Sequence, residues 1–241
     1  MTSTRDARRS TPRTLVLITI GSEALDRNWL FMTREVVLLA AKNHSMFIVD
    51  ICRDAGIPVH GFLDDTLPIG HKAMDRPVLG GFSMMEDASF RDNFDFFVAM
   101  GTPKDRLNWG RKLIDVGATV RNIVHPSCVV TQDLSIGLGV LLCPFTVVHA
   151  DAAIGNFVVV DNHSTVAHHV ELADGVNLSP GVRAMGSVSV GETTFIGAGA
   201  VLVPRISIGA RSMVGAGAVV TKDIPSDVTV VGNPAKVLNT N

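Results

Sequence analysis

Half of the eight histidines lie within twenty-one consecutive residues. Imidazole is the usual general base at neutral pH, because its charge changes in that range. A single histidine near a turn is usually a solvated surface group, whereas a cluster of this density favours a catalytic site. The four are His149, His163, His168 and His169.

A strict six-residue period predicts what surrounds these imidazoles. Every sixth residue from Val124 to Val220 is aliphatic, at seventeen consecutive positions. Helices repeat every 3.6 residues and strands every 2, so a period of six indicates a parallel β-helix of hexapeptide repeats rather than a β-sandwich. Three hexads make one triangular turn, and residues eighteen apart then lie above one another at about 4.8 Å.

The stacking places a glycine over one of the histidines. Gly186 follows His168 by eighteen residues and is therefore expected one coil above it. A glycine leaves its backbone N–H uncovered. A general base beside an unshielded backbone donor suits acyl transfer, because one takes the proton of the nucleophile and the other stabilises the oxyanion.

Glycine also follows the inward aliphatic residue at several corners, where a tight turn leaves little room for a side chain. These corner glycines are Gly137, Gly155, Gly191, Gly197, Gly209 and Gly215.

Upstream of the repeat, apolar runs alternate with helical patterns, as in a small Rossmann-like α/β domain. We expect strands over Val36–Ala41, Val59–Leu63 and Phe94–Met100, and helices near Phe47–Asp54 and Lys104–Val116. The predicted organisation is an extension over residues 1–35, the α/β domain over 36–117, and the β-helix with a C-terminal tail over 118–241.

Polar residues follow the first two of these strands. The loop containing Asn43 and His44 occupies the place of a phosphate-binding loop but lacks its glycines. Asp64 and Asp65 come about twenty residues later, the spacing at which a carboxylate accepts hydrogen bonds from a ribose or base. The two carboxylates could equally be solvated turn residues, and spacing alone does not decide.

The composition argues against several partners. A formal net charge of -2 over 241 residues favours neither nucleic acid nor an anionic membrane. The apolar run Leu15–Ile20 is too short for a secretory core or a membrane span, and we expect a disordered tail before it. The odd number of cysteines, without metal-ligand spacing, indicates reduced thiols in a cytoplasmic protein; they are Cys52, Cys128 and Cys143.

Five segments together carry a resemblance to a known family: Gly61–Asp65, Arg76–Gly81, Val124–Ser127, Asp161–Gly181 and Val231–Lys236. The sequence resembles the hexapeptide-repeat acetyltransferases of the sialic acid O-acetyltransferase type, which include bacterial nucleotide-sugar N-acetyltransferases. The last segment alone is common to many hexapeptide transferases, whereas the five in this order, after an α/β domain, are specific.

The resemblance implies a left-handed β-helix that forms a homotrimer with intersubunit active sites, and an α/β domain that holds the nucleotide. It makes His168 the general base, with His169 beside it, and Gly186 the oxyanion donor. It implies substrate contacts from Asn43, His44, Asp64, Asp65 and Asp161. It implies contacts with the acetyl donor, acetyl-CoA, from Asn177, Gly186, Pro234 and Lys236, and no metal.

The chain departs from the family pattern around the base. The family usually has Asp or Glu directly after its catalytic histidine, and this chain has His169. The carboxylate that orients the imidazole is therefore absent from its usual place. Asp161 stands where the family often has Asn, and Asn177 where it often has His.

We therefore predict an acetyl-CoA-dependent N-acetyltransferase acting on a nucleotide-linked amino sugar, with a 4-amino sugar as first choice. A sugar O-acetyltransferase is the nearest alternative. A γ-carbonic-anhydrase-like zinc enzyme is a second, because His163 and His168 have the His-x4-His spacing and His149 could be a third ligand. A non-catalytic β-helix scaffold is a third.

Overall fold

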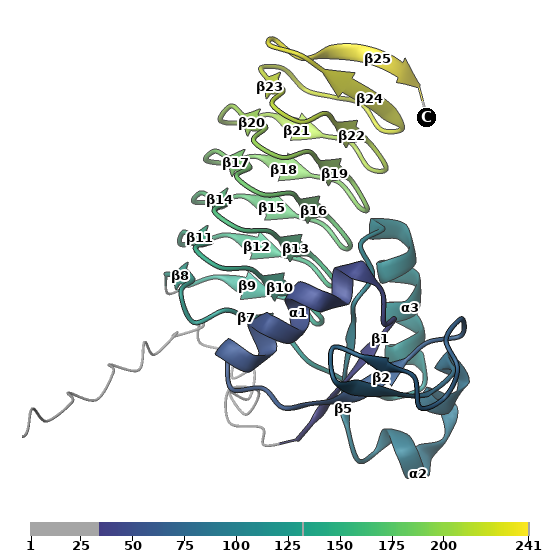
Figure 1. Ribbon diagram of the computed structural model, residues 1–241. Coiled ribbons are helices and arrows are strands. Elements are labelled where there is room, and N and C mark those ends of the chain that lie inside the picture. The colour runs from purple at the N-terminus through teal and green to yellow at the C-terminus, as the bar shows by residue number, and fades with distance from the viewer. Residues whose placement is uncertain (1–33, 132, 241) are drawn as a thin grey trace, which may run out of the picture.

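The chain folds into a small α/β unit joined to a tall coil of short strands (Figure 1). The computed structural model describes residues 34–131 and 133–240. The predicted N-terminal extension, apart from residues 34 and 35, lies outside the described residues. The predicted fold class, an α/β domain followed by a parallel β-helix of hexapeptide repeats, is confirmed.

The α/β unit is built on one six-stranded sheet, with strand order β3-β4-β2-β1-β5-β6. Its strands are parallel except for the β3–β4 pair. All four residues of β1 are buried, because the sheet is covered on both faces. The strands are β1 (Val36–Leu39), β2 (Val59–Leu63), β3 (Lys72–Ala73), β4 (Arg76–Gly80), β5 (Asp95–Val98) and β6 (Thr119–Val120).

The helices of this unit are α1 (Asn43–Asp54), the 3-10 helix η2 (Phe82–Glu86), α2 (Ala88–Arg91) and α3 (Pro103–Asp115). The three strands and two helices expected from the sequence are confirmed, with ends shifted by a few residues. The sequence missed β3, β4, η2, α2 and β6. The strands β3 and β6 have only two residues each, and β4 contains Pro77, which argues against a strand in a sequence. Because β6 pairs with β5, the α/β sheet extends a few residues past the domain boundary predicted at 117.

The β-helix has three parallel sheets, and most of its strands are two residues long. The first contains β7 (Ile123–Val124), β10 (Leu141–Leu142), β13 (Val159–Val160), β16 (Asn177–Leu178), β19 (Phe195–Ile196), β22 (Met213–Val214), β24 (Val228–Val231) and an antiparallel β25 (Lys236–Thr240). The second contains β8 (Val129–Val130), β11 (Val147–Val148), β14 (Thr165–Val166), β17 (Arg183–Ala184), β20 (Val201–Leu202) and β23 (Val219–Val220). The third contains β9 (Ser135–Ile136), β12 (Ala153–Ile154), β15 (Glu171–Leu172), β18 (Ser189–Val190) and β21 (Ser207–Ile208).

The eighteen-residue stacking is confirmed by the strand register. Leu142 pairs with Val124 on one side and with Val160 on the other. The second residue of most strands points inward, and together these residues form the buried core of the coil. Corner glycines are needed for space: a Cβ on Gly137 would lie 2.7 Å from the backbone nitrogen of Asn156 in the next coil.

The α/β unit packs against the outer face of the first sheet. Ile48 and Cys52 of α1 share a buried cluster with Ile123, Leu141 and Val159, the outward residues of the lowest strands. This contact positions the carboxyl ends of the α/β strands beside the lower coils.

Arg106 of α3 joins the two units by hydrogen bonds. Its fully buried guanidinium donates from Nε to Phe157 O at 2.8 Å and from Nη2 to Gly175 O at 3.1 Å, both in the β-helix. On the α/β side, Nη1 donates to Met100 O at 3.0 Å. Burial lowers the pKa of Arg106 to about 10, so the side chain is charged at neutral pH.

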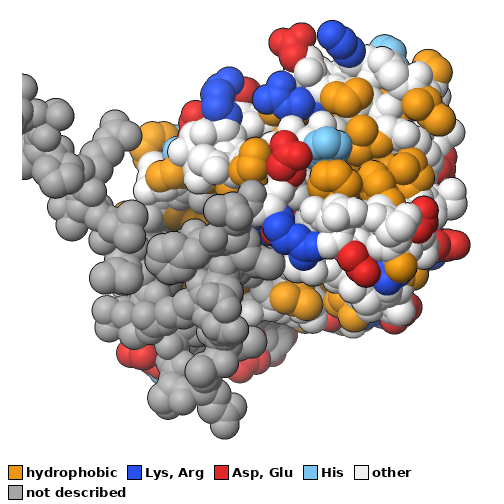
Figure 2. Space-filling model, turned by 90° about the horizontal axis from the view of Figure 1, so that it is seen from below, with side chains coloured by type: hydrophobic (Ala, Val, Ile, Leu, Met, Phe, Trp, Pro, Cys, Tyr) orange, Lys and Arg blue, Asp and Glu red, His pale blue; other side chains and the backbone are white. Residues whose placement is uncertain are grey.

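The described surface carries charges of both signs. Seen from below, Lys and Arg side chains alternate with Asp and Glu, and hydrophobic side chains gather between them (Figure 2). Within the described residues, no helix is long and apolar enough to cross a membrane.

Candidate active site

His168 lies at an exposed corner of the coil, after β14. Gly186 occupies the same corner one coil above, after β17. A Cβ added to Gly186 would lie 2.6 Å from Cε1 and 2.7 Å from Nε2 of His168, closer than real Cβ atoms approach other atoms. The predicted stacking of these two residues is therefore confirmed, and the glycine is needed for the imidazole to keep its place.

The backbone around Gly186 is held on both sides. Ser187 N donates to His168 O at 3.0 Å, and Arg205 N donates to Gly186 O at 3.1 Å. The N–H of Gly186 itself makes no hydrogen bond within the described part of the chain. This corner therefore carries an imidazole and, one coil above it, a backbone N–H without a described partner, and such a donor can stabilise the oxyanion of acyl transfer.

His169 places a second imidazole on the other edge of His168. The two Nδ1 atoms are 3.1 Å apart, and the rings are nearly perpendicular. On its far side, His169 Nε2 lies 3.6 Å from Oδ2 of Asp151, which is at the same corner one coil below. The residue after His168 is not an acid, but the carboxylate of Asp151 lies next to His169, which in turn contacts His168.

Away from this corner, a hollow of about 320 Å³ opens at the carboxyl ends of β1, β2 and β5. In open parallel sheets this edge is where ligands bind. The walls include His44, Asp64, Asp65, Thr66 and Asp105.

The two neighbouring aspartates have different surroundings. Asp64 is buried and accepts hydrogen bonds from Thr66 N at 2.7 Å, Thr66 Oγ1 at 2.6 Å and Ala41 N at 3.0 Å. Burial raises the pKa of Asp64, but these hydrogen bonds outweigh it and hold the pKa below its usual value. Asp65 is exposed. Its Oδ1 accepts a hydrogen bond from Phe82 N at 2.8 Å, and its Oδ2 has no hydrogen-bond partner among the described residues. Asp65 is therefore the better placed of the two to meet a ligand.

His44 lies at the start of α1 and lines the same hollow. Burial, and then the nearby charge of Arg106, lower the pKa of His44 to about 4. Its ring is therefore neutral at physiological pH. Its Nε2 is buried and makes no hydrogen bond to any described residue.

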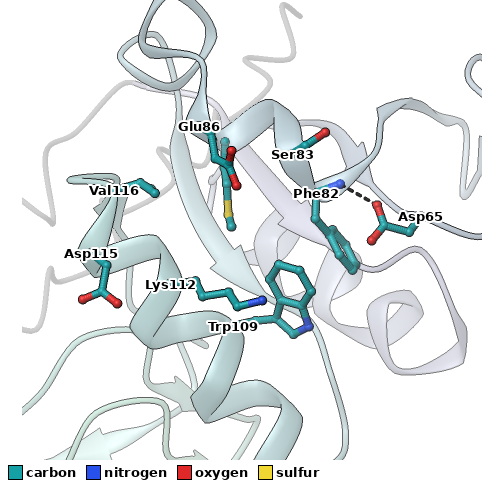
Figure 3. Close-up of a pocket in the computed structure, with 9 residues that line it drawn as sticks. Asp65, Phe82, Ser83, Glu86, Trp109, Lys112, Asp115 and Val116 are labelled. Atoms are coloured by element: carbon teal, nitrogen blue, oxygen red, sulfur yellow. Dashed lines mark hydrogen bonds between the residues drawn. The ribbon is translucent and has the colours of Figure 1, made fainter.

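Another hollow, of about 420 Å³, adjoins the one lined by His44, because Asp65 and Phe82 line both. Figure 3 shows Trp109 between Phe82 and Lys112, with Glu86 and Asp115 farther from the ring. The Phe82 and Trp109 ring centroids are 4.4 Å apart, and Lys112 Nζ lies 3.9 Å from the Trp109 ring centroid. Since Trp109 already contacts both side chains, we assign this hollow no ligand.

The remaining predicted contacts lie away from His168 within one chain. Asp161 is at the preceding corner, and Asn177 is buried on the outward face of the first sheet. Pro234 and Lys236 are exposed at the C-terminal end of the coil (Figure 1). Asn43 is the first residue of α1. One chain therefore does not gather all the predicted donor and substrate contacts.

The histidines of the zinc alternative do not share one corner: His149 and His168 follow strands of the second sheet in successive coils, whereas His163 follows a strand of the first sheet. His163 stacks on Phe145, with ring centroids 4.9 Å apart, at the corner before the one that holds His168. Among the described residues, no group of three or more His, Cys, Asp or Glu side chains is placed to hold a metal ion.

The sequence did not predict two residues near the site, Asp151 and Arg106. Asp151 precedes His169 by eighteen residues, so the rule that placed Gly186 would also have placed Asp151. Arg106 gave no such signal, because its partners in the β-helix are 51 to 70 residues away along the chain.

Both units of the chain match known protein families. Residues 35–113 match the PglD N-terminal domain, and residues 187–222 match the bacterial transferase hexapeptide family. GDP-perosamine N-acetyltransferase of Escherichia coli is 34% identical over 180 residues, which are 73% of this chain and 80% of that protein.

Solved structures share the overall fold of this chain. PerB from Caulobacter crescentus, in complex with CoA and GDP-perosamine, has a TM-score of 0.81 and 31% identity, covering 86% of this chain and 99% of that one. The acetyltransferase domain of PglB from Neisseria gonorrhoeae, in complex with acetyl coenzyme A, has a TM-score of 0.80 and 30% identity, covering 86% and 100%.

The chain thus belongs to the hexapeptide-repeat acetyltransferases that carry a PglD N-terminal domain. It is an acetyl-CoA-dependent nucleotide-sugar N-acetyltransferase, as predicted from the sequence.

Proposed function

We propose that this enzyme acetylates the 4-amino group of a GDP-linked amino sugar, with His168 as general base. The observation that carries the assignment is the stacking of Gly186 over the His168 imidazole, so close that a Cβ on Gly186 would meet the Cε1 and Nε2 atoms of the ring. The nucleotide is proposed because both GDP-perosamine N-acetyltransferase of Escherichia coli and PerB are named with that sugar nucleotide.

The reaction needs one base and one oxyanion donor. His168 Nε2 takes a proton from the sugar amine as its nitrogen attacks the thioester carbonyl of acetyl-CoA. The N–H of Gly186 stabilises the negative oxygen of the tetrahedral intermediate. The carbon–sulfur bond then breaks, and the imidazolium returns the proton to the sulfur, so that CoA leaves as a thiol.

The nucleotide is proposed to bind in the hollow lined by His44 and Asp65. The N-terminus of α1 opens onto this hollow, and free backbone N–H groups at a helix start favour phosphate. Asp65 has one carboxylate oxygen without a described partner and is proposed to accept hydrogen bonds from the ribose or base. Asp64 holds the loop that presents it.

We also propose a homotrimer in which a neighbouring copy completes the acetyl-CoA site. Two observations support this: Asp161 and Asn177 lie away from His168 within one chain, and hydrophobic side chains are exposed along the coil. Examples are Val129, Phe145 and Met185, with exposed fractions of 59%, 56% and 38%. Light scattering at micromolar concentration tests the assembly, and a monomer would contradict it. We propose a cytoplasmic location, where acetyl-CoA is available.

The decisive experiment follows thiol release from acetyl-CoA with GDP-, UDP- and dTDP-linked 4-amino sugars. We expect turnover with the GDP sugar and a loss of about 10²–10⁴-fold in His168→Ala. His149→Ala is the control, because this exposed histidine belongs only to the zinc alternative. Near-normal turnover in His168→Ala would refute the proposal.

The same products separate N-acetylation from O-acetylation. An acetyl amide survives mild alkali, whereas an acetyl ester is hydrolysed. Recovery of a product that loses its acetyl group in alkali would favour the O-acetyltransferase alternative.

A further inference from the structure

The corner that holds His168 contains a line of three titratable side chains from two successive coils. Asp151 Oδ2 is 3.6 Å from His169 Nε2, and His169 Nδ1 is 3.1 Å from His168 Nδ1. No hydrogen bond reaches His168 Nε2 from any described residue, and Gly186 lies over the Cε1 and Nε2 side of the ring, where an added Cβ would come within 2.7 Å of both atoms. Asp151 and His169 therefore lie on the Nδ1 side of His168, opposite the Nε2 atom that is proposed to take the proton.

We propose that Asp151 and His169 together replace the acid that the family usually places directly after its catalytic histidine. In this arrangement Asp151 and His169 are positioning residues, which act through His168. The inference rests on the proposed role of His168 as general base.

The argument depends on where the protons lie. The contact between the two Nδ1 atoms needs one proton, so one ring donates and the other accepts. If His169 donated, the proton of neutral His168 would be on Nε2, and His168 could not act as a base there. A carboxylate facing His169 Nε2 favours a proton on that nitrogen, which leaves Nδ1 of His169 as an acceptor. His168 then carries its proton on Nδ1 and presents a free Nε2.

The backbone supports this placement. Asp151 and His169 both have a left-handed backbone, with φ of 58° at each. His169 N approaches Ala150 O at 3.4 Å, which ties the two corners together. Both side chains project from stacked turns at a fixed separation, so the geometry follows from the coil rather than from a mobile loop.

The first test substitutes the carboxylate. Asp151→Asn removes the charge and suits the turn, because Asn tolerates a left-handed backbone. We expect kcat to fall about tenfold with KM for both substrates unchanged, because Asp151 is proposed to act through His168 and not on a substrate. Asp133→Asn is the matched control: Asp133 is at the same corner one coil below, with φ of 67°, and is not part of the line. It should leave kcat unchanged.

The second test restores an acid next to His168. His169→Asp is expected to lose less activity than His169→Asn, because only the former supplies a carboxylate. In the His169→Asp background, adding Asp151→Asn should have no further effect. An equal loss from Asp151→Asn in both backgrounds, or a loss below twofold in the wild type, would overturn the proposal.

A third measurement does not depend on turnover. Long-range ¹⁵N–¹H spectra of histidine-labelled enzyme identify which ring nitrogen carries the proton. We expect His168 protonated on Nδ1 in the wild type and a loss of that preference in Asp151→Asn. A wild-type His168 protonated on Nε2 would overturn the proposal, whereas an inactive enzyme with the expected spectra would implicate only the proposed substrate.

Discussion

Arg106 in α3 and Phe157 in the β-helix are joined by a hydrogen bond of 2.8 Å from the guanidinium Nε to the backbone oxygen. The bond crosses the junction between the α/β unit, which holds the hollow lined by His44 and Asp65, and the coil that holds His168. The same guanidinium also reaches Gly175 O at 3.1 Å. Arg106 thus fixes the two halves of the site relative to each other.

Replacing Arg106 with Met should destabilise the protein strongly. The substitution leaves several buried carbonyl oxygens without donors, at about 1–3 kcal/mol each when unsatisfied. We expect the free energy of unfolding in urea to fall by roughly 3–5 kcal/mol. Arg111→Met on the same helix is the control, because its ion pair with Glu192, at 2.6 Å, is half exposed. It should cost at most about 1 kcal/mol, and similar losses from both variants would contradict the assignment.

Replacing Gly186 with Ala should impair catalysis rather than folding. The new Cβ would meet the His168 ring at 2.6 Å, so the imidazole must move. Displacement of a catalytic group by about 1 Å costs on the order of 10²-fold in rate. We expect kcat to fall by about that factor while the melting temperature changes by only a few degrees. Unchanged kcat would show that the position of this imidazole is not critical.

His44 should make stability depend on pH in acid. Its pKa in the folded protein is about 4, against 6.5 for an unperturbed histidine, because burial disfavours the charged ring. Between these values the unfolded chain binds more protons, so stability falls as the pH drops from 6.5 towards 4. The full effect is roughly 2–3 kcal/mol.

His44→Asn should flatten this dependence in urea unfolding at several pH values between 6.5 and 4. His71→Asn, at an exposed position in the same unit, should leave it as in the wild type. A dependence that persists in His44→Asn would assign the proton uptake to another group.

The interior of the coil should be sensitive to lost volume. Leu142 is 1% exposed and stacks between Val124 and Val160. Leu142→Ala should reduce the free energy of unfolding by roughly 2–5 kcal/mol. Ser135→Ala, at an exposed position in the third sheet, should change the free energy of unfolding by less than about 0.5 kcal/mol. Comparable values for the two variants would mean that the interior is loosely packed.

The sequence alone determined the coil and the position of Gly186 over His168. Each turn of a β-helix repeats a local geometry, so a count of eighteen residues translates directly into vertical stacking. The main strands and helices of the α/β unit were also readable, because their apolar runs are long enough to show a pattern. The two-residue strand β3 and the proline-containing strand β4 were not.

Only the tertiary structure decided how neighbouring or distant polar residues divide their roles. Asp64 and Asp65 are adjacent and chemically identical, yet one is buried under three hydrogen bonds and the other faces the hollow. Arg106 finds its partners across an interface between two units, and Asp151 reaches His168 only through the ring of His169. Spacing places Asp151 one coil below His169, but the side-chain directions and the packing of separate elements that make these contacts are not encoded in residue type and spacing.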